Sequence, residues 1–154
     1  MDVFLIRHAA AVAETLELRD PMRHLTAEGR HQAASLGDRL RWHDCIPTHV
    51  WTSPLVRAVQ TAELVMAVLK VDVTIDVLPA LAAGESPHVV QAAVKRLPAD
   101  AAVILVGHEP GLSGVGALLA GEDYFRALGK AEAARIVDGA VRWRYAWNAE
   151  HPVR

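Results

Sequence analysis

The sequence contains very little cysteine and no long hydrophobic run. Its single cysteine, Cys45, has no partner for an internal disulfide and cannot build a thiolate metal cluster. The longest uninterrupted apolar stretch, residues 101–106, is far shorter than the roughly 20 residues that a membrane helix needs. Strand-like sequence begins at residue 2, with none of the basic, apolar and small-residue succession of a signal peptide before it. We therefore expect a cytoplasmic protein that has no membrane association.

The sequence also lacks an excess of charge of either sign. It has 16 lysines and arginines against 18 aspartates and glutamates, for a formal net charge of −2. Binding to nucleic acid or to an anionic membrane calls for a marked basic excess, so we expect neither partner. A phosphate-bearing ligand would have to be held by a local group of cations. A length of 154 residues with 52% hydrophobic content suits one compact domain over residues 1–154.

Short apolar runs of β-prone residues alternate with helical patterns along most of the chain. The expected strands cover residues 2–6, 49–52, 71–77 and 102–106. The expected helices begin after Thr26, at Ser53-Pro54, at Ser86-Pro87 and after Pro110. In the second of these, Ser53 is interpreted as the helix cap and Pro54 as the first helical residue.

The chain is expected to end in a hairpin. Asp138-Gly139 is a strong turn signal between residues 134–137 and 141–147. In the second arm, three aromatic residues alternate with Arg142 and Arg144, which predicts an aromatic face packed on a helix and two arginines in solvent. The whole order predicts a three-layer α/β fold: a mixed, mostly parallel sheet with helices on both faces and a C-terminal antiparallel hairpin.

Polar groups follow three of the expected parallel strands. Arg7 and His8 end the first, Ser53 and then Arg57 follow the second, and His108 follows the strand over residues 102–106. Ligands of such sheets bind beyond the carboxyl ends of the strands. We therefore expect two arginines and two histidines to meet at one edge.

This combination of side chains favours phosphate chemistry. Arginine presents a planar, permanently charged fork that matches phosphoryl oxygens. A neutral imidazole can attack phosphorus, and a second imidazole can donate to an oxygen or carry a proton, which suits His8 and His108. The helix that begins near Pro54 adds free backbone N–H groups and the positive end of a dipole. No metal-binding motif of the H-x-x-E-H, H-E-x-x-H or paired-cysteine type is present.

Three motifs and one loop carry a resemblance to a known family. The motifs are LIRHA (residues 5–9), TSPLVRAVQT (52–61) and VGHEPG (106–111), and the loop is DPMRHLT (20–26). In order and setting the chain resembles the histidine phosphatase (phosphoglycerate mutase-like) superfamily over nearly its whole length. The loop makes it similar to a short bacterial branch, the SixA phosphohistidine phosphatases.

The resemblance implies a role for each site residue. His8 would be the nucleophile and would form a phosphohistidine intermediate that water hydrolyses. Arg7, Arg57 and His108 would hold the phosphoryl oxygens and stabilise charge in the transition state, and Arg23 would reach the same pocket from its loop. Neither a metal nor another cofactor is implied.

Two positions depart from the family pattern. Ala9 stands where glycine usually follows the nucleophile, so its methyl group could crowd the phosphate or be incompatible with a positive φ. Ala80 stands, within LPAL (residues 78–81), where relatives that cleave phosphomonoesters have an acid. Only Glu85 or Glu109 is a candidate replacement.

The missing acid bears on the substrate. An alkoxide leaving group gains about 10²-fold to 10⁴-fold from a general acid, whereas a protonated imidazole leaves readily without one. Together with the absence of a cap or lid insertion, this predicts a phosphatase for protein phosphohistidine, such as a histidine phosphotransfer domain in a signalling phosphorelay. The alternatives are a small-molecule phosphomonoesterase that uses Glu85 or Glu109, and a non-catalytic phosphate-binding module. A mutase is disfavoured because it must enclose its intermediate.

Overall fold

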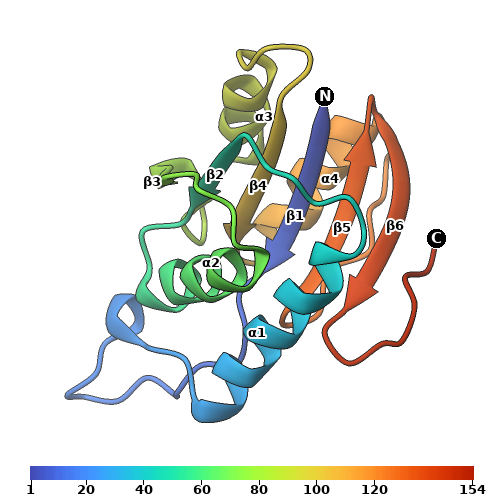
Figure 1. The fold of residues 1–154 in the computed structure, drawn as a ribbon. Helices are drawn as coiled ribbons and strands as arrows, with labels where there is room; N and C mark the ends of the chain where they lie inside the picture. The colour runs from blue at the N-terminus through green and yellow to red at the C-terminus, as the bar shows by residue number, and fades with distance from the viewer.

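A six-stranded sheet with the strand order β3-β2-β4-β1-β5-β6 runs through the centre of the computed structural model, which describes residues 1–154 (Figure 1). The strands are β1 (Asp2–Arg7), β2 (His49–Thr52), β3 (Ile75–Val77), β4 (Ala102–Gly107), β5 (Glu132–Val137) and β6 (Ala140–Ala146). β3, β2, β4 and β1 are parallel to one another, and β5 and β6 continue the sheet antiparallel. The expected mixed, mostly parallel sheet with a C-terminal hairpin is confirmed.

Helices cover both faces of this sheet (Figure 1). α1 (Ala27–Arg41) and α2 (Val56–Leu69) pack on one face, and α3 (Pro87–Lys95) and α4 (Gly111–Ala120) pack on the other. β1 contributes to both cores by alternation: Phe4 and Ile6 pack with α1 and α2, whereas Val3 and Leu5 pack with α3 and α4. No helix is both long and apolar enough to cross a membrane, the longest having 15 residues.

Most helix starts follow the predicted caps, but α2 does not. Thr26 Oγ1 accepts a hydrogen bond from Gly29 N at 2.9 Å, and Ser86 Oγ caps α3. α2 begins at Val56 with Leu55 as its N-cap, so the interpretation of Ser53 as the cap and of Pro54 as the first helical residue is wrong. The reason is that the backbone is still extended at Leu55, with φ −72° and ψ 140°, although Ser53 Oγ accepts a hydrogen bond from Leu55 N.

The third strand is also shorter than expected. β3 covers only Ile75–Val77, whereas the alternating pattern predicted a strand over residues 71–77. It lies at the edge of the sheet and pairs only with the four-residue β2, which begins opposite residue 74, so residues 71–73 have no neighbouring strand to pair with.

The C-terminal hairpin turns at the predicted place, but a bulge changes which side chains face the core. Asp138 and Gly139 both have positive φ, 48° and 79°, as a type I′ turn requires. Arg135 pairs with Trp143 while Ile136 pairs with Val141, so Arg142 is an extra residue. Trp143 therefore packs with α1 and α2, as the alternation predicted for the aromatic residues.

The expectation that Arg144 faces solvent is wrong. Its side chain is buried, lies 5.0 Å above the centre of the Phe125 ring and forms an ion pair with Glu132 at 3.4 Å. Arg142, the bulge residue, is exposed as expected. The bulge places Arg144 on the face of β6 opposite Trp143, where Phe125 covers it. The ion pair with Glu132 compensates its charge there.

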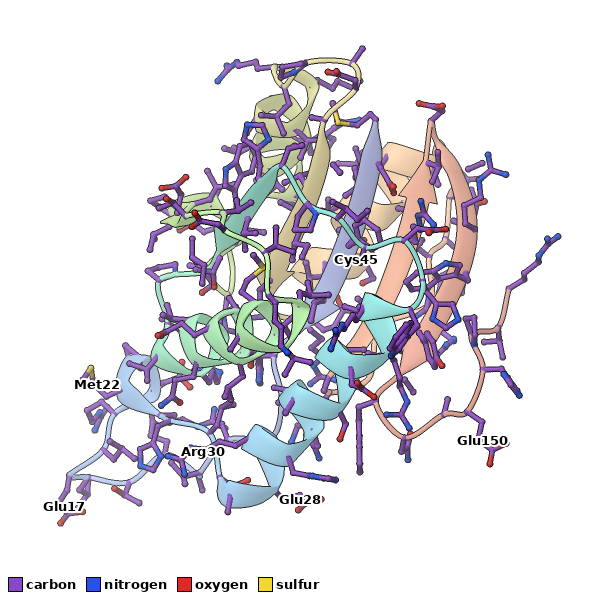
Figure 2. All side chains as sticks on the ribbon, viewed as in Figure 1. Glu17, Met22, Glu28, Arg30, Cys45 and Glu150 are labelled. Carbon is purple, nitrogen blue, oxygen red and sulfur yellow. The ribbon has the colours of Figure 1, made fainter.

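A long loop, residues 8–26, connects β1 to α1 and contains a short 3₁₀ turn at Asp20–Met22. Glu17 and Met22 lie at its outer end (Figure 2). The base of the loop is tied to α1, because Thr26 N and Thr26 Oγ1 both donate to Ala10 O. Cys45 lies away from this loop in the core, where burial raises the pKa of its thiol to about 12.

Gly29 is required where α1 crosses this loop. A Cβ at Gly29 would overlap the carbonyl oxygen of Ala10, whereas a Cβ at Gly111, in the first turn of α4, would meet nothing within 4 Å. We expect Gly29→Ala to lower the free energy of unfolding by about 1–3 kcal/mol through overpacking, and Gly111→Ala to leave it unchanged or slightly higher. Urea unfolding of the two variants checks this, and equal stabilities would contradict it.

Candidate active site

The register of the parallel strands brings both histidines to one edge of the sheet. His8 follows β1, and its N–H donates to Gly107 O at 3.1 Å. Ser53 follows β2, and its N–H donates to Val106 O at 2.9 Å. β4 thus lies between the other two strands and ends immediately before His108. The His8 and His108 ring centres are 5.1 Å apart.

His8 is held in a defined tautomer. Its side chain is buried, and its Nδ1 lies 2.8 Å from Ala9 O. A carbonyl oxygen can only accept, so Nδ1 carries the proton and Nε2 keeps a free lone pair. Burial, together with the nearby charges of Arg57 and Arg7, lowers the pKa of His8 to about 4. The ring is therefore neutral near pH 7, which is the state of a nitrogen nucleophile.

His108 is also buried and neutral. Burial lowers the pKa of its ring to about 3, and the proximity of His8 and Arg57 acts in the same direction. Nε2 lies 2.7 Å from Ser53 Oγ. Nδ1 is buried and has no hydrogen-bond partner.

Three of the four predicted site residues each have a buried side-chain nitrogen without a hydrogen-bond partner. Arg7 Nε, Arg57 Nε and His108 Nδ1 are buried without a hydrogen-bond partner, and the one other such side-chain atom in the protein is Arg144 Nε in the hairpin. Leaving buried donors unsatisfied is costly, at about 1–3 kcal/mol each. A phosphoryl group, with several acceptor oxygens, is the kind of ligand that can satisfy them together. The structure thus brings Arg7, Arg57, His8 and His108 together, as the sequence predicted.

Arg23 reaches this group only through Asp20. Its Nε donates to Val12 O, and its NH1 donates to Asp20 Oδ1 at 2.9 Å. Arg57 NH1 in turn donates to Asp20 O at 2.9 Å and lies 3.4 Å from Asp20 Oδ1. The hydrogen bond from Arg23, reinforced by Arg57, keeps the pKa of Asp20 below its usual range.

Asp20 and Thr61 are site residues that the sequence analysis did not single out. Thr61 Oγ1 accepts from Ala9 N at 3.1 Å and donates to Arg57 O at 2.8 Å, so it joins the residue after His8 to the helix that carries Arg57. Both residues lie within the quoted motifs, but an acidic loop residue and a helical threonine have no distinctive pattern of their own.

Ala9 fits its position without strain. It is not among the residues with positive φ. Its methyl group is fully buried and packs in a small cluster with Leu25, Ala33 and Ala131. The first departure from the family pattern is therefore accommodated by packing.

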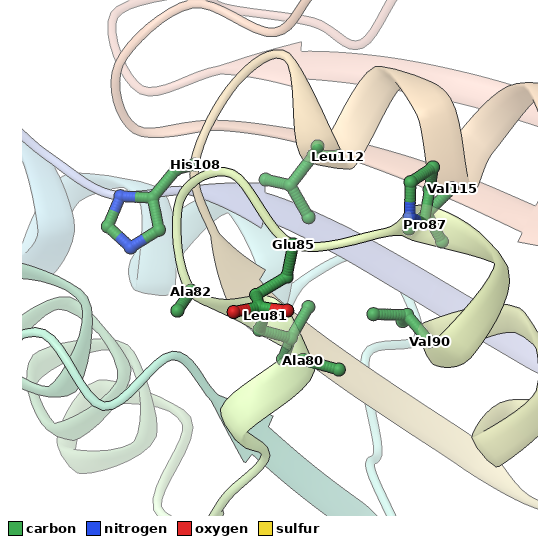
Figure 3. Close-up of a pocket in the computed structure, with 10 residues that line it drawn as sticks. Ala80, Leu81, Ala82, Glu85, Pro87, Val90, His108, Leu112 and Val115 are labelled. Carbon is green, nitrogen blue, oxygen red and sulfur yellow. The ribbon is translucent and has the colours of Figure 1, made fainter.

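The second departure leaves a recess beside His108 without a well-placed acid. Ala80 and Ala82 line this recess together with His108, and its only carboxylate is the exposed Glu85 (Figure 3). Glu109 has a structural task, because its two carboxylate oxygens accept from Ser113 N at 2.7 Å and Leu128 N at 2.9 Å. Nowhere do three or more His, Cys, Asp or Glu side chains form a group that could hold a metal ion.

Comparison with known proteins identifies the family. A sequence model of the histidine phosphatase superfamily (branch 1) matches residues 3–83, more than half of the chain. The chain therefore belongs to the histidine phosphatase superfamily. Among curated proteins, none matches the sequence significantly.

Solved structures show the same fold. The protein histidine phosphatase SixA complexed with tungstate aligns with a TM-score of 0.87 at 24% identity, over 96% of this chain and 97% of that one. A protein of Nakamurella multipartitia assigned as a SixA phosphohistidine phosphatase aligns with a TM-score of 0.73 at 25% identity, over 99% and 96% of the two chains. A histidine-to-alanine mutant of phosphoserine phosphatase from Entamoeba histolytica, in complex with phosphoserine, aligns with a TM-score of 0.70 at 13% identity, over 96% and 98%.

The geometry separates the role of His8 from that of Arg57. We expect His8→Ala to abolish turnover while leaving tungstate binding largely intact, because the three unpartnered donors remain. Arg57→Ala should weaken tungstate binding and reduce transition-state stabilisation by about 3 kcal/mol, roughly 10²-fold in kcat/KM. Calorimetric titration with tungstate and steady-state kinetics measure both effects. Normal turnover by the His8 variant would rule out covalent catalysis by this residue.

The neutral histidines also make stability depend on pH. The pKa values of the two rings in the folded protein, about 4 for His8 and about 3 for His108, lie below the ordinary value of 6.5. Below pH 6.5 the unfolded chain therefore binds more protons than the folded protein does. The stability that the two neutral histidines contribute should therefore have its full value above pH 7. The free energy of unfolding should fall as the pH drops below 6.5. Each histidine contributes at most about 1.4 kcal/mol per pH unit.

Urea unfolding between pH 7.5 and about pH 5 isolates the histidines from most carboxylates, which titrate lower. We expect the His108→Gln variant to show a shallower slope than the original protein. Identical slopes would show that His108 is not held neutral in the folded state.

Proposed function

We propose that this protein is a metal-independent phosphatase that removes phosphate from phosphohistidine on other proteins by way of a phosphorylated His8. The observation that carries the proposal is the site itself: a neutral histidine whose Nδ1 is bonded to Ala9 O, together with three buried nitrogens, Arg7 Nε, Arg57 Nε and His108 Nδ1, that lack partners. A covalent phosphoryl transfer requires a nucleophile and a set of anion-binding donors.

In the first step, the Nε2 lone pair of His8 attacks the phosphorus atom. A bond forms between Nε2 and phosphorus while the bond from phosphorus to the substrate nitrogen breaks, and the leaving imidazole takes the electron pair. Arg7, Arg57 and His108 donate hydrogen bonds to the non-bridging oxygens, where the charge is spread in the transition state. The bond from His8 Nδ1 to Ala9 O supports the positive charge that develops on the ring.

In the second step, water attacks the same phosphorus atom and His8 Nε2 leaves with its electron pair. The water proton passes to solvent or to the phosphate, and inorganic phosphate departs. The ring returns to the neutral tautomer with its proton on Nδ1. The burial that depresses the pKa of His8 favours this neutral product state.

Phosphohistidine is favoured by the acids around the site. A protonated imidazole is a good leaving group, whereas an alkoxide needs a proton donor. Ala80 has no acidic group, Glu109 is committed to two backbone N–H groups, and Glu85 is exposed at the recess. The fold shared with SixA proteins supports the same substrate class. A cytoplasmic phosphorelay, with a histidine phosphotransfer domain as the partner, is the setting that fits this substrate.

A small-molecule phosphomonoesterase is the second candidate function. Glu85 is the one carboxylate in the recess that His108 borders, so it is the candidate acid of this alternative (Figure 3). A phosphoserine phosphatase also shares the fold. In this case Glu85 would supply the proton that an alkoxide needs. A non-catalytic phosphate-binding module is disfavoured, because such a module has no need of a neutral histidine with a free nitrogen.

Substrate preference tests the proposal directly. We expect kcat/KM for phosphate release from a phosphohistidine-bearing phosphotransfer domain to exceed that for every member of a panel of small phosphomonoesters. The His8→Ala protein serves as the blank. Glu85→Gln should hardly change cleavage of the phosphohistidine domain, because an imidazole leaving group needs no carboxylic acid.

A preference for one phosphomonoester, with a loss of about 10²-fold or more on Glu85→Gln, would establish the phosphomonoesterase instead. Binding of the phosphorylated domain without turnover would establish the non-catalytic module.

A further inference from the structure

The Ser53 hydroxyl group makes two hydrogen bonds, one with the backbone and one with the ring of His108. It is fully buried, and its Oγ accepts a hydrogen bond from Leu55 N at 3.1 Å. The same Oγ lies 2.7 Å from His108 Nε2. No other partner contacts this hydroxyl group. A serine hydroxyl has a single hydrogen to donate, and the bond from Leu55 N already uses a lone pair of the oxygen.

The hydrogen of Ser53 therefore has one acceptor within reach, which is His108 Nε2. If Nε2 carried a proton instead, the hydroxyl hydrogen would be left unpaired in a buried position, at a cost of about 1–3 kcal/mol. Nε2 is then the acceptor, and the single proton of the neutral ring resides on Nδ1.

Nδ1 is the ring nitrogen that this arrangement leaves available, in a ring whose centre lies 5.1 Å from that of His8. It is buried and unpartnered, and the ring interacts with His8, Arg57, Arg7 and Asp20. With a proton on Nδ1, the ring can donate to a phosphoryl oxygen. With a lone pair there, it would repel the same oxygen. The tautomer of His108 thus decides whether the residue attracts or repels the ligand.

We infer that Ser53 is a positioning residue that fixes the tautomer of His108, so that Nδ1 donates to the phosphoryl group. It acts through His108 and does not touch the reacting atoms. The inference rests on the proposed function only in requiring that the site takes a phosphoryl-like oxyanion.

The backbone fixes the two partners relative to each other. Ser53 N donates to Val106 O, two residues before His108, and Thr52 pairs with Val106 in the sheet. The Ser53 hydroxyl and the His108 ring are thereby held by one strand register. This geometry involves protein groups alone, so no ligand is needed to set the tautomer.

The tautomer can be measured in the unaltered protein. Long-range ¹H–¹⁵N spectra distinguish a protonated ring nitrogen from one with a lone pair. We expect His108 to show a protonated Nδ1 and an unprotonated Nε2 in the free protein and with tungstate bound. A protonated Nε2 in the free protein would overturn the inference, and this result requires neither a variant nor a substrate.

Variants then test whether Ser53 is the cause. Ser53→Ala should shift His108 toward a mixture of tautomers and weaken tungstate binding by about 10-fold to 100-fold, by analogy with the loss seen when the partner that orients a metal-ligating histidine is removed. Ser53→Thr keeps the hydroxyl group and should restore most of the loss. Ser86→Ala is the matched control, because Ser86 Oγ also accepts from a backbone N–H two residues on, His88 N, but contacts no ring.

A double-mutant cycle completes the test. In the His108→Ala background, Ser53→Ala should have no further effect on tungstate affinity. An equal loss in both backgrounds would show that Ser53 acts through general packing and would overturn the inference. Failure to cleave phosphohistidine, with the tautomer and the cycle as expected, would contradict the proposed substrate and leave the role of Ser53 intact.

Discussion

The position of β4 between β1 and β2 is the constraint on which the site depends. Both neighbours are parallel to it, so all three strands deliver their carboxyl ends to one edge. The bonds from His8 N to Gly107 O and from Ser53 N to Val106 O extend this pairing past the last strand residues. The two histidines and the serine are consequently positioned by backbone hydrogen bonds in the core of the sheet, and only the arginine of α2 and the loop are added from outside.

Burial then determines the chemistry of the groups that the sheet has brought together. The same desolvation lowers the pKa values of His8 and His108 and leaves N–H donors of Arg7 and Arg57 without water. Neutral rings beside cationic guanidinium groups form a site that repels protons and attracts oxyanions. Neither property would survive in an open, hydrated cleft, where both histidines would titrate near their ordinary pKa of about 6.5.

The architecture and the four central residues could be predicted from the sequence. The hydrophobic periodicity indicates the strands and helices, and the four residues follow directly after expected strands or lie in recognisable motifs. The apolar runs that end in Arg7-His8 and in Gly107-His108 are visible as strands with polar ends, and three spaced motifs point to one family. The details that failed depend on contacts distant in sequence. Ser53 resembles a helix cap locally, but its partner His108 lies 55 residues away.

Arg144, the length of β3 and the role of Asp20 were also missed because they depend on contacts between residues distant in sequence. The orientation of Arg144 depends on a one-residue bulge opposite Arg135, and no local signal announces a bulge. The length of β3 depends on how much of β2 is available to pair with it. Asp20 is one acidic residue among many, and only the folded loop shows that it meets Arg57 and Arg23.

The contact between Asp20 and Arg57 places a carbonyl and a carboxylate in competition with any anion that would bind the same guanidinium nitrogen. An anion that takes the nitrogen now bonded to Asp20 has to displace the carbonyl and the carboxylate of this residue. Such a competitor lowers the affinity for substrate and for inorganic phosphate alike. An enzyme that must discard phosphate in every cycle gains from weak retention of its product, provided that the rest of a large substrate supplies binding energy elsewhere.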